Sequence, residues 1–398
     1  MLFYIYIISL YLFVVKKDTL ILSQLSFIAF AGVTAFYLLA RGNFHIGKPM
    51  AFAYLSCGWM FATVLWAYSR YYAIVRVKTM WQIFILFFLV YNLFCNDKDA
   101  HKKLVKALYT AGVAFIVYTV YTYGIKGIID SLTGGEMQRL GSKISQENVF
   151  GTQHATTAMI AIFYLLYHKK HKTFHLIVLA SSFICAMSSG SRKALLIVIA
   201  GGLYLIYKRY GIKQLYKTVF VGAVMGMVFI TVIQLPMFET IRIRTEQGIN
   251  SIMGKGSGDE STRQRLSYIR NGFNLFKSRP IHGYGADNFA IASGTGTYAH
   301  NNFTEVMVDF GAVGFLLYYA MYIIAFNRLR KNSNTYSKFL FVLFVVYIFM
   351  ETAVVTYFDK LQWILFAFFM MDNAKLQKDS TDKGDKNEDD FKKIEESI

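Results

Sequence analysis

The chain has 398 residues, of which 55% are hydrophobic and 17% are charged, and its formal net charge is +18 at pH 7. Soluble domains average about 25% charged residues, so this composition excludes an ordinary soluble enzyme and favours a protein with many membrane-spanning segments. A membrane location also argues against nucleic acid as the partner of the positive charge. Three cysteines, Cys57, Cys95 and Cys185, all lie in apolar segments, which excludes a disulfide framework.

Twelve apolar runs follow one another along the chain, most of them long enough to cross a bilayer as a helix. They span residues 2–15, 19–40, 50–69, 79–95, 104–125, 149–168, 173–189, 193–207, 215–235, 303–326, 338–357 and 361–372. The stretch 341–349 is apolar on every face and lacks the alternation of a membrane-spanning strand, which predicts helices. We therefore expect an all-α, polytopic integral membrane protein with about 12 transmembrane helices.

Lysines and arginines are concentrated in alternate connections between these runs. They follow the even-numbered runs, as Lys103 does after the fourth and Lys208 after the eighth, whereas residues 16–17 are an exception. Basic residues are retained on the cytoplasmic side, so both termini are expected to be cytoplasmic. The long connection over residues 236–299 then lies outside the cytoplasm.

Residues 1–372 are expected to form one transmembrane domain that includes this outer segment, and residues 373–398 a separate tail. The tail is rich in lysines and acids and holds almost no large apolar side chain. Because such a segment buries too little apolar surface to fold, we expect a disordered cytoplasmic tail. A chain-length regulator is a possible partner for it.

An amphipathic helix is expected over residues 262–277 of the outer segment. Its apolar stripe recurs at the 3,4,3 spacing of one helix face and consists of Leu266, Ile269, Phe273 and Phe276. At about 100° per residue, Arg265 lies about 60° from the centre of this stripe and Arg263 about 100° away on the opposite flank. Arg265 is therefore the better candidate to point into the protein.

A Ser-Gly-Ser-Arg sequence at residues 189–192 stands directly before the eighth run. A serine ahead of a helix that begins with an arginine combines an N-cap, free backbone N–H groups and a fixed positive charge, which suits a phosphate. Arg192 has a competing interpretation, because basic residues at helix ends commonly extend to lipid headgroups.

Together with two later motifs, these features resemble the bacterial O-antigen polymerase and O-antigen ligase superfamily of membrane glycan-transfer proteins. The resemblance covers about Ser188 to Gly314. It rests on residues 189–192, on Arg265 fifteen residues before Pro280, on Pro-Ile-His-Gly-Tyr-Gly at 280–285 followed by Asn288-Phe289, and on His300-Asn301 followed by Gly-Ala-Val-Gly at 311–314. Relatives usually carry a bulky aromatic one turn after the loop arginine, where this chain has Ile269 beside Tyr268, so Arg263 is an alternative match.

The resemblance implies a GT-C-like fold and transfer of a glycan from a polyprenyl-pyrophosphate donor to an acceptor hydroxyl, outside the bacterial cytoplasmic membrane. Arg192 and Arg265 would stabilise the charge on the leaving pyrophosphate without a metal or another cofactor. His300 would take or orient the acceptor proton, and nearby arginines should favour its neutral imidazole. Displacement in one step would invert the anomeric centre. Without the family pattern, an interfacial histidine is more often a hydrogen-bonding anchor.

Further residues are candidates for substrate contact. They are Arg263, Ser191, Asn301, Glu305, Asp309, His154 and Arg139, with Lys143 as a neighbour of Arg139. Glu305 and Asp309 lie one helical face below His300 and are expected either to orient it or to pair with an arginine. Glu351 is a third carboxylate in a predicted span. The Asp97-Lys98-Asp99 sequence resembles a metal motif, but it falls in a short cytoplasmic connection, and no metal site is expected.

Three functions fit these features. The first is a polymerase that joins lipid-linked repeat units, with glycan donor, glycan acceptor and membrane lipids as partners. The second is a ligase that moves a finished glycan to another acceptor, and the absence of an extra soluble acceptor-binding domain favours the polymerase. The third is a transporter or flippase, which would place charged or broken helices at the bilayer midplane in two related halves. Here the polar residues gather at the outer end instead.

Overall fold

The fold of a computed structural model is described for residues 1–13, 20–42, 44–133, 139–168, 170–211, 260–332 and 334–371, with scattered residues between 216 and 246. Within these ranges every regular element is a helix, which confirms the all-α prediction there. Five of the described helices are long and apolar enough to cross a membrane, and they are α2, α4, α5, α6 and α13. The described part of the chain is therefore all-α and typical of a membrane protein, whereas the count of about 12 spans and the GT-C-like fold remain predictions.

Eleven of the twelve apolar runs coincide with helices. These are α1 (Leu2–Leu12), α2 (Leu20–Arg41), α3 (Lys48–Ala62), α4 (Arg70–Phe94), α5 (Ala100–Thr133), α6 (Glu147–Tyr167), α7 (Lys172–Ser188), α8 (Arg192–Tyr210), α13 (Asn302–Lys331), α14 (Thr335–Glu351) and α15 (Lys360–Phe369). Most of the predicted ninth run, most of residues 236–259 and the tail lie outside the described residues. The predicted outer helix is α11 (Glu260–Ser278), and a short α12 (Phe289–Ala292) follows it.

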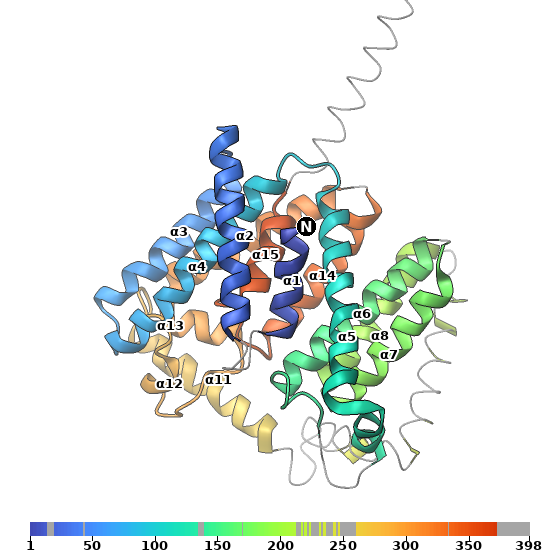
Figure 1. Cartoon of the computed structure of the whole chain (residues 1–398). Helices are drawn as coiled ribbons and strands as arrows, with labels where there is room; N and C mark the ends of the chain where they lie inside the picture. The colour runs from blue at the N-terminus through green and yellow to red at the C-terminus, as the bar shows by residue number, and fades with distance from the viewer. Residues whose placement is uncertain are drawn as a thin grey trace, which may run out of the picture.

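The helices form two groups that α5 and α14 connect (Figure 1). In one group α6 packs against both α7 and α8, and in the other α13 packs against α3, and α15 against α4. Helix α2 lies at the edge and exposes large apolar side chains, including Phe36 at 75% and Ile28 at 63%. Such a surface suits contact with lipid rather than with water.

Polar side chains mark where several helices begin. Asn301, Asn334 and Asp359 occupy the N-cap positions of α13, α14 and α15, and each accepts a hydrogen bond from a backbone N–H of the first turn. These contacts satisfy amides that a helix cannot pair internally. The capping residue at each of these three positions therefore explains where α13, α14 and α15 begin.

The connections between helices gather at two ends of the bundle. At the end that holds α11 and α12, here called the α11 end, Tyr68 N–H bonds the Tyr284 carbonyl and Gln146 bonds the Tyr298 hydroxyl. At the opposite end, the His101 ring contacts the Ser337 hydroxyl at 2.7 Å. The described parts of three connections predicted to be external therefore lie together at the α11 end.

Helix α13 is broken at Gly311, whose φ is +65°. The break leaves backbone groups without helical partners, and residues 280–285 supply them. Tyr284 N–H bonds the Val308 carbonyl at 2.9 Å, and Ala312 N–H bonds the Pro280 carbonyl at 2.8 Å. The two glycine-containing motifs of the sequence therefore bind each other.

Two glycines permit this close approach. A Cβ at Gly311 would collide with the Ile281 carbonyl, and a Cβ at Gly283, whose φ is +69°, would lie 2.6 Å from the Asp309 carbonyl oxygen. A larger residue at either position would combine left-handed backbone strain with a clash against backbone.

We expect Gly311→Ala to lower stability far more than Gly294→Ala. Gly294 has a similar φ of +69° but nothing within 4 Å of its Cβ position, so its substitution carries only the conformational cost of about 1–2 kcal/mol. Gly311→Ala adds overpacking, which typically costs a further 1–3 kcal/mol or so. Thermal unfolding midpoints of the two variants in detergent measure the difference, and equal midpoints would contradict the proposed packing.

Candidate functional site

His300 lies in the turn between α12 and α13, and two tyrosines fix its ring. The Tyr298 ring is 4.1 Å away between centroids, and the Tyr268 ring of α11 is nearly parallel at 6.1 Å. The backbone of His300 has a φ of +54°, in the left-handed region that non-glycine residues rarely adopt. Such strain persists only where the surrounding structure holds it.

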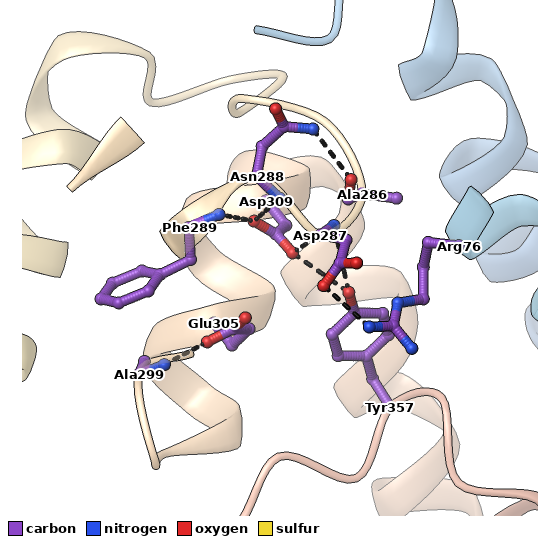
Figure 2. Close-up of polar contacts among 9 residues, drawn as sticks. All are labelled: Arg76, Ala286, Asp287, Asn288, Phe289, Ala299, Glu305, Asp309 and Tyr357. Carbon is purple, nitrogen blue, oxygen red and sulfur yellow. Dashed lines mark hydrogen bonds and ion pairs between the residues drawn. The ribbon is translucent and has the colours of Figure 1, made fainter. Parts of the chain in front are cut away.

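Contacts on both sides of His300 hold this turn. The Glu305 carboxylate accepts a hydrogen bond from Ala299 N–H at 2.5 Å, as Figure 2 shows. The Asn301 side chain caps α13 by accepting from Thr304 N–H at 2.9 Å. Glu305 is therefore placed to orient His300 through the backbone, which was one of its two predicted roles.

The second carboxylate of α13, Asp309, anchors the segment before α12. It accepts hydrogen bonds from Asp287 N–H and Phe289 N–H, each at 2.9 Å, and from the Tyr357 hydroxyl at 3.1 Å (Figure 2). Asp287 in turn forms an ion pair of 2.8 Å with Arg76 of α4. Because both Glu305 and Asp309 are buried and bind backbone groups, the prediction that they contact substrate finds no support in the structure.

Positive side chains from two helices surround His300. Helix α8 begins at Arg192, and the next residue, Lys193, donates a hydrogen bond of 2.6 Å to the Ala353 carbonyl. The charges of Arg265 on α11 and of Lys193 both act on His300, and those of Arg192 and Arg265 act on Lys193. Lys193 and Arg265, which lie more than seventy positions apart in the sequence, thus act on the same histidine at the α11 end.

This environment favours the neutral imidazole of His300. Burial and the positive charges of Arg265 and Lys193 lower the pKa of His300 from 6.5 to about 4. At neutral pH the ring is therefore in the proton-accepting form that a general base requires.

The family described as O-antigen ligase matches residues 175–319, which include α7, α8, α11, α12 and the first half of α13. This stretch holds Arg192, Arg265 and His300. Residues 175–319 are an O-antigen ligase family domain. This match supports the resemblance of the chain to the O-antigen polymerase and ligase superfamily of membrane glycan-transfer proteins. A comparison with curated proteins gave no match.

Within the O-antigen ligase domain, the two candidate loop arginines differ in position. Arg263 is exposed on α11, whereas Arg265 is partly buried and its charge reaches His300. The aromatic ring beside His300 belongs to Tyr268, three residues after Arg265. This geometry favours Arg265 over Arg263, as the position of each on the helix predicted.

Ser191 occupies the N-cap position of α8, but its side chain does not form the hydrogen bond of an N-cap. Its hydroxyl makes no hydrogen bond to the first turn, and among the described residues this buried oxygen has no hydrogen-bond partner. The expected N-cap contact is therefore wrong, although the Ser191 backbone is held by an N–H bond of 3.1 Å to the Ser189 hydroxyl. Arg139 supports the same turn by donating to the Ser189 carbonyl at 2.8 Å and to the Asn148 side chain at 3.3 Å.

His154 and Glu351 belong to the interior of the bundle. The fully buried His154 ring lies 4.6 Å from the Phe115 ring and 4.5 Å from the Phe150 ring, so the structure gives no support to a glycan contact. Glu351 accepts hydrogen bonds from the hydroxyls of Tyr319, at 3.1 Å, and Thr356, at 2.7 Å. Both side chains have structural partners.

The sequence interpretation missed Lys193. Its only sequence signal is a second positive charge directly after Arg192 at the start of an apolar run, which is also typical of a residue that extends to headgroups.

We expect His300 to titrate near its lowered pKa of about 4. Protonation would add a positive charge beside Arg265 and Lys193, so the neutral form persists until the pH falls to that value. Arg265→Met removes one of these charges and should raise the pKa of His300 towards its ordinary value of about 6.5. Magnetic resonance titration of ¹⁵N-labelled histidines, with His300→Gln for assignment, measures both values.

Lys277→Met is the matched control, because Lys277 is an exposed cation on the same helix. It should leave the titration unchanged. A wild-type pKa near the ordinary value, or no response to Arg265→Met, would contradict the described electrostatics.

Proposed function

We propose that this protein polymerises polyprenyl-pyrophosphate-linked oligosaccharide repeat units into a polysaccharide of the O-antigen, capsular or exopolysaccharide type. The observation that carries the proposal is that the charges of Arg265 and Lys193 act on His300, and those of Arg192 and Arg265 on Lys193, at one end of a bundle of apolar helices. A glycan-transfer reaction needs cations for the leaving group and a base for the acceptor, and this end supplies both.

The proposed reaction is a single displacement at the anomeric carbon of the donor glycan. The bond between C1 and the pyrophosphate oxygen breaks, and its electron pair stays on the pyrophosphate. The acceptor hydroxyl oxygen forms the new bond to C1 from the opposite face, so the configuration inverts. His300 accepts the hydroxyl proton, while Arg192 and Arg265 stabilise the negative charge that develops on the lipid pyrophosphate without a metal ion.

The site is proposed to face the outside of a bacterial cytoplasmic membrane. The basic connections that follow the fourth, sixth, eighth and tenth apolar runs lie together at the opposite end of the bundle, where His101 contacts Ser337, Arg209 the Leu166 carbonyl and His168 Tyr336. Basic connections are retained in the cytoplasm. Both termini are then cytoplasmic. The donor would enter from the lipid with its pyrophosphate at the α11 end.

Ligation to a different acceptor is the alternative function, since it would use the same donor site. The two activities differ in their products. A polymerase makes a ladder of repeat lengths from one substrate, whereas a ligase needs a second acceptor and makes a single addition.

Purified protein in detergent is expected to convert its cognate lipid-linked repeat unit into a ladder resolved on a gel. His300→Ala should slow this conversion by about 10²- to 10⁴-fold, which is the usual contribution of a general base. Arg192→Ala should slow it by about 10²- to 10³-fold through loss of charge stabilisation. The matched control is His282→Ala, because His282 is an exposed histidine of the α11 end whose carbonyl and ring contact Trp66.

Normal ladders from folded His300→Ala protein would remove His300 from the mechanism. Product that appears only after a separate acceptor is added, and then as a single step, would identify a ligase. Substrate that crosses vesicle membranes unchanged would identify a transporter.

A further inference from the structure

Arg192, Lys193 and Arg265 form a group of basic side chains that we call the cation cluster. Within it, Lys193 is held by a backbone carbonyl group. Its ammonium group donates to the Ala353 carbonyl at 2.6 Å, and the side chain is partly buried. An ammonium group has three N–H donors, so this contact leaves two. Because the contact is to a carbonyl oxygen, it orients the Lys193 amine without placing a countercharge beside it.

The loop that holds Lys193 also holds the start of α13. Asn301 donates to the Thr352 carbonyl at 3.1 Å, one residue before the carbonyl that Lys193 uses. Asn302 accepts from Thr356 N–H at 2.9 Å. The loop after α14 therefore fixes the Lys193 ammonium relative to His300, which directly precedes Asn301.

The charge of the leaving group changes during the proposed reaction. In the donor, the pyrophosphate is esterified at both ends and carries two negative charges. When the bond to the sugar breaks, the released prenyl diphosphate carries a third once its new terminal phosphate is fully ionised. Arg192 and Arg265 bring two positive charges near Lys193. Lys193 adds a third when its amine is protonated, which is the form that a bound diphosphate anion stabilises.

We propose that Lys193 is a third cation of the donor site and binds the diphosphate of the lipid donor together with Arg192 and Arg265. This inference rests on the proposed function, because it takes the donor class from it. Lys193 would contribute most to the ligand with the most negative charge, so it should favour a prenyl diphosphate over a prenyl monophosphate.

Binding of geranylgeranyl diphosphate to the full chain in detergent tests this directly, without the cognate glycan. Lys193→Gln removes the charge but keeps an N–H donor for the Ala353 carbonyl, so the fold should survive. We expect it to weaken diphosphate binding by about tenfold or more, as for loss of a charged hydrogen bond, and to weaken geranylgeranyl monophosphate binding less. Lys193→Arg should restore diphosphate binding to within about threefold of wild type, because it restores the charge.

Lys277→Gln, which removes an exposed positive charge from α11, is the matched control and should bind as wild type does. Equal diphosphate affinities for Lys193→Gln and wild type would overturn the role of Lys193 while leaving the proposed function intact. Equal losses of affinity for the diphosphate and the monophosphate in Lys193→Gln would also overturn the role of Lys193. Wild-type protein that binds no prenyl diphosphate would overturn the proposed donor class, and the inference with it.

Discussion

The break in α13 at Gly311 is the constraint on which the rest of the site depends. Residues 280–285 bind the backbone groups that the break exposes, and this pairing fixes the chain that leads from α11 to α12. Asp309, two residues before the break, then anchors the start of α12 through backbone N–H groups. One turn earlier, Glu305 holds the strained turn at His300.

Carboxylate side chains hold the loops of the site in place. Glu305 and Asp309 bind backbone N–H groups, and Asp287 binds Arg76 from α4 (Figure 2). The α4 helix lies outside the matched O-antigen ligase domain, so the N-terminal half of the chain contributes to holding its loops. The charges of Arg265 and Lys193 act on His300, and positive charges grouped in this way would stabilise an anionic ligand.

Hydropathy predicted the helices well, because a membrane-spanning helix is a local property of its own residues. The helix face predicted that Arg265, not Arg263, points inward, and the short motifs predicted the family. The pairing of residues 280–285 with α13 could not be predicted, since it joins backbone groups of distant segments. The burial of His154 between two phenylalanines could not be predicted either, because it depends on how α5 and α6 pack. Lys193 was missed because only the folded chain brings it to His300.

The central claim is that a lipid diphosphate binds between α8 and α11 beside His300. Electron cryo-microscopy of the protein in lipid nanodiscs with geranylgeranyl diphosphate tests it most directly. The account predicts diphosphate density within hydrogen-bonding distance of Arg192 and Arg265, at the α11 end, with the prenyl chain directed into lipid. Density at the opposite end of the bundle, or bound diphosphate without contact to either arginine, would contradict it.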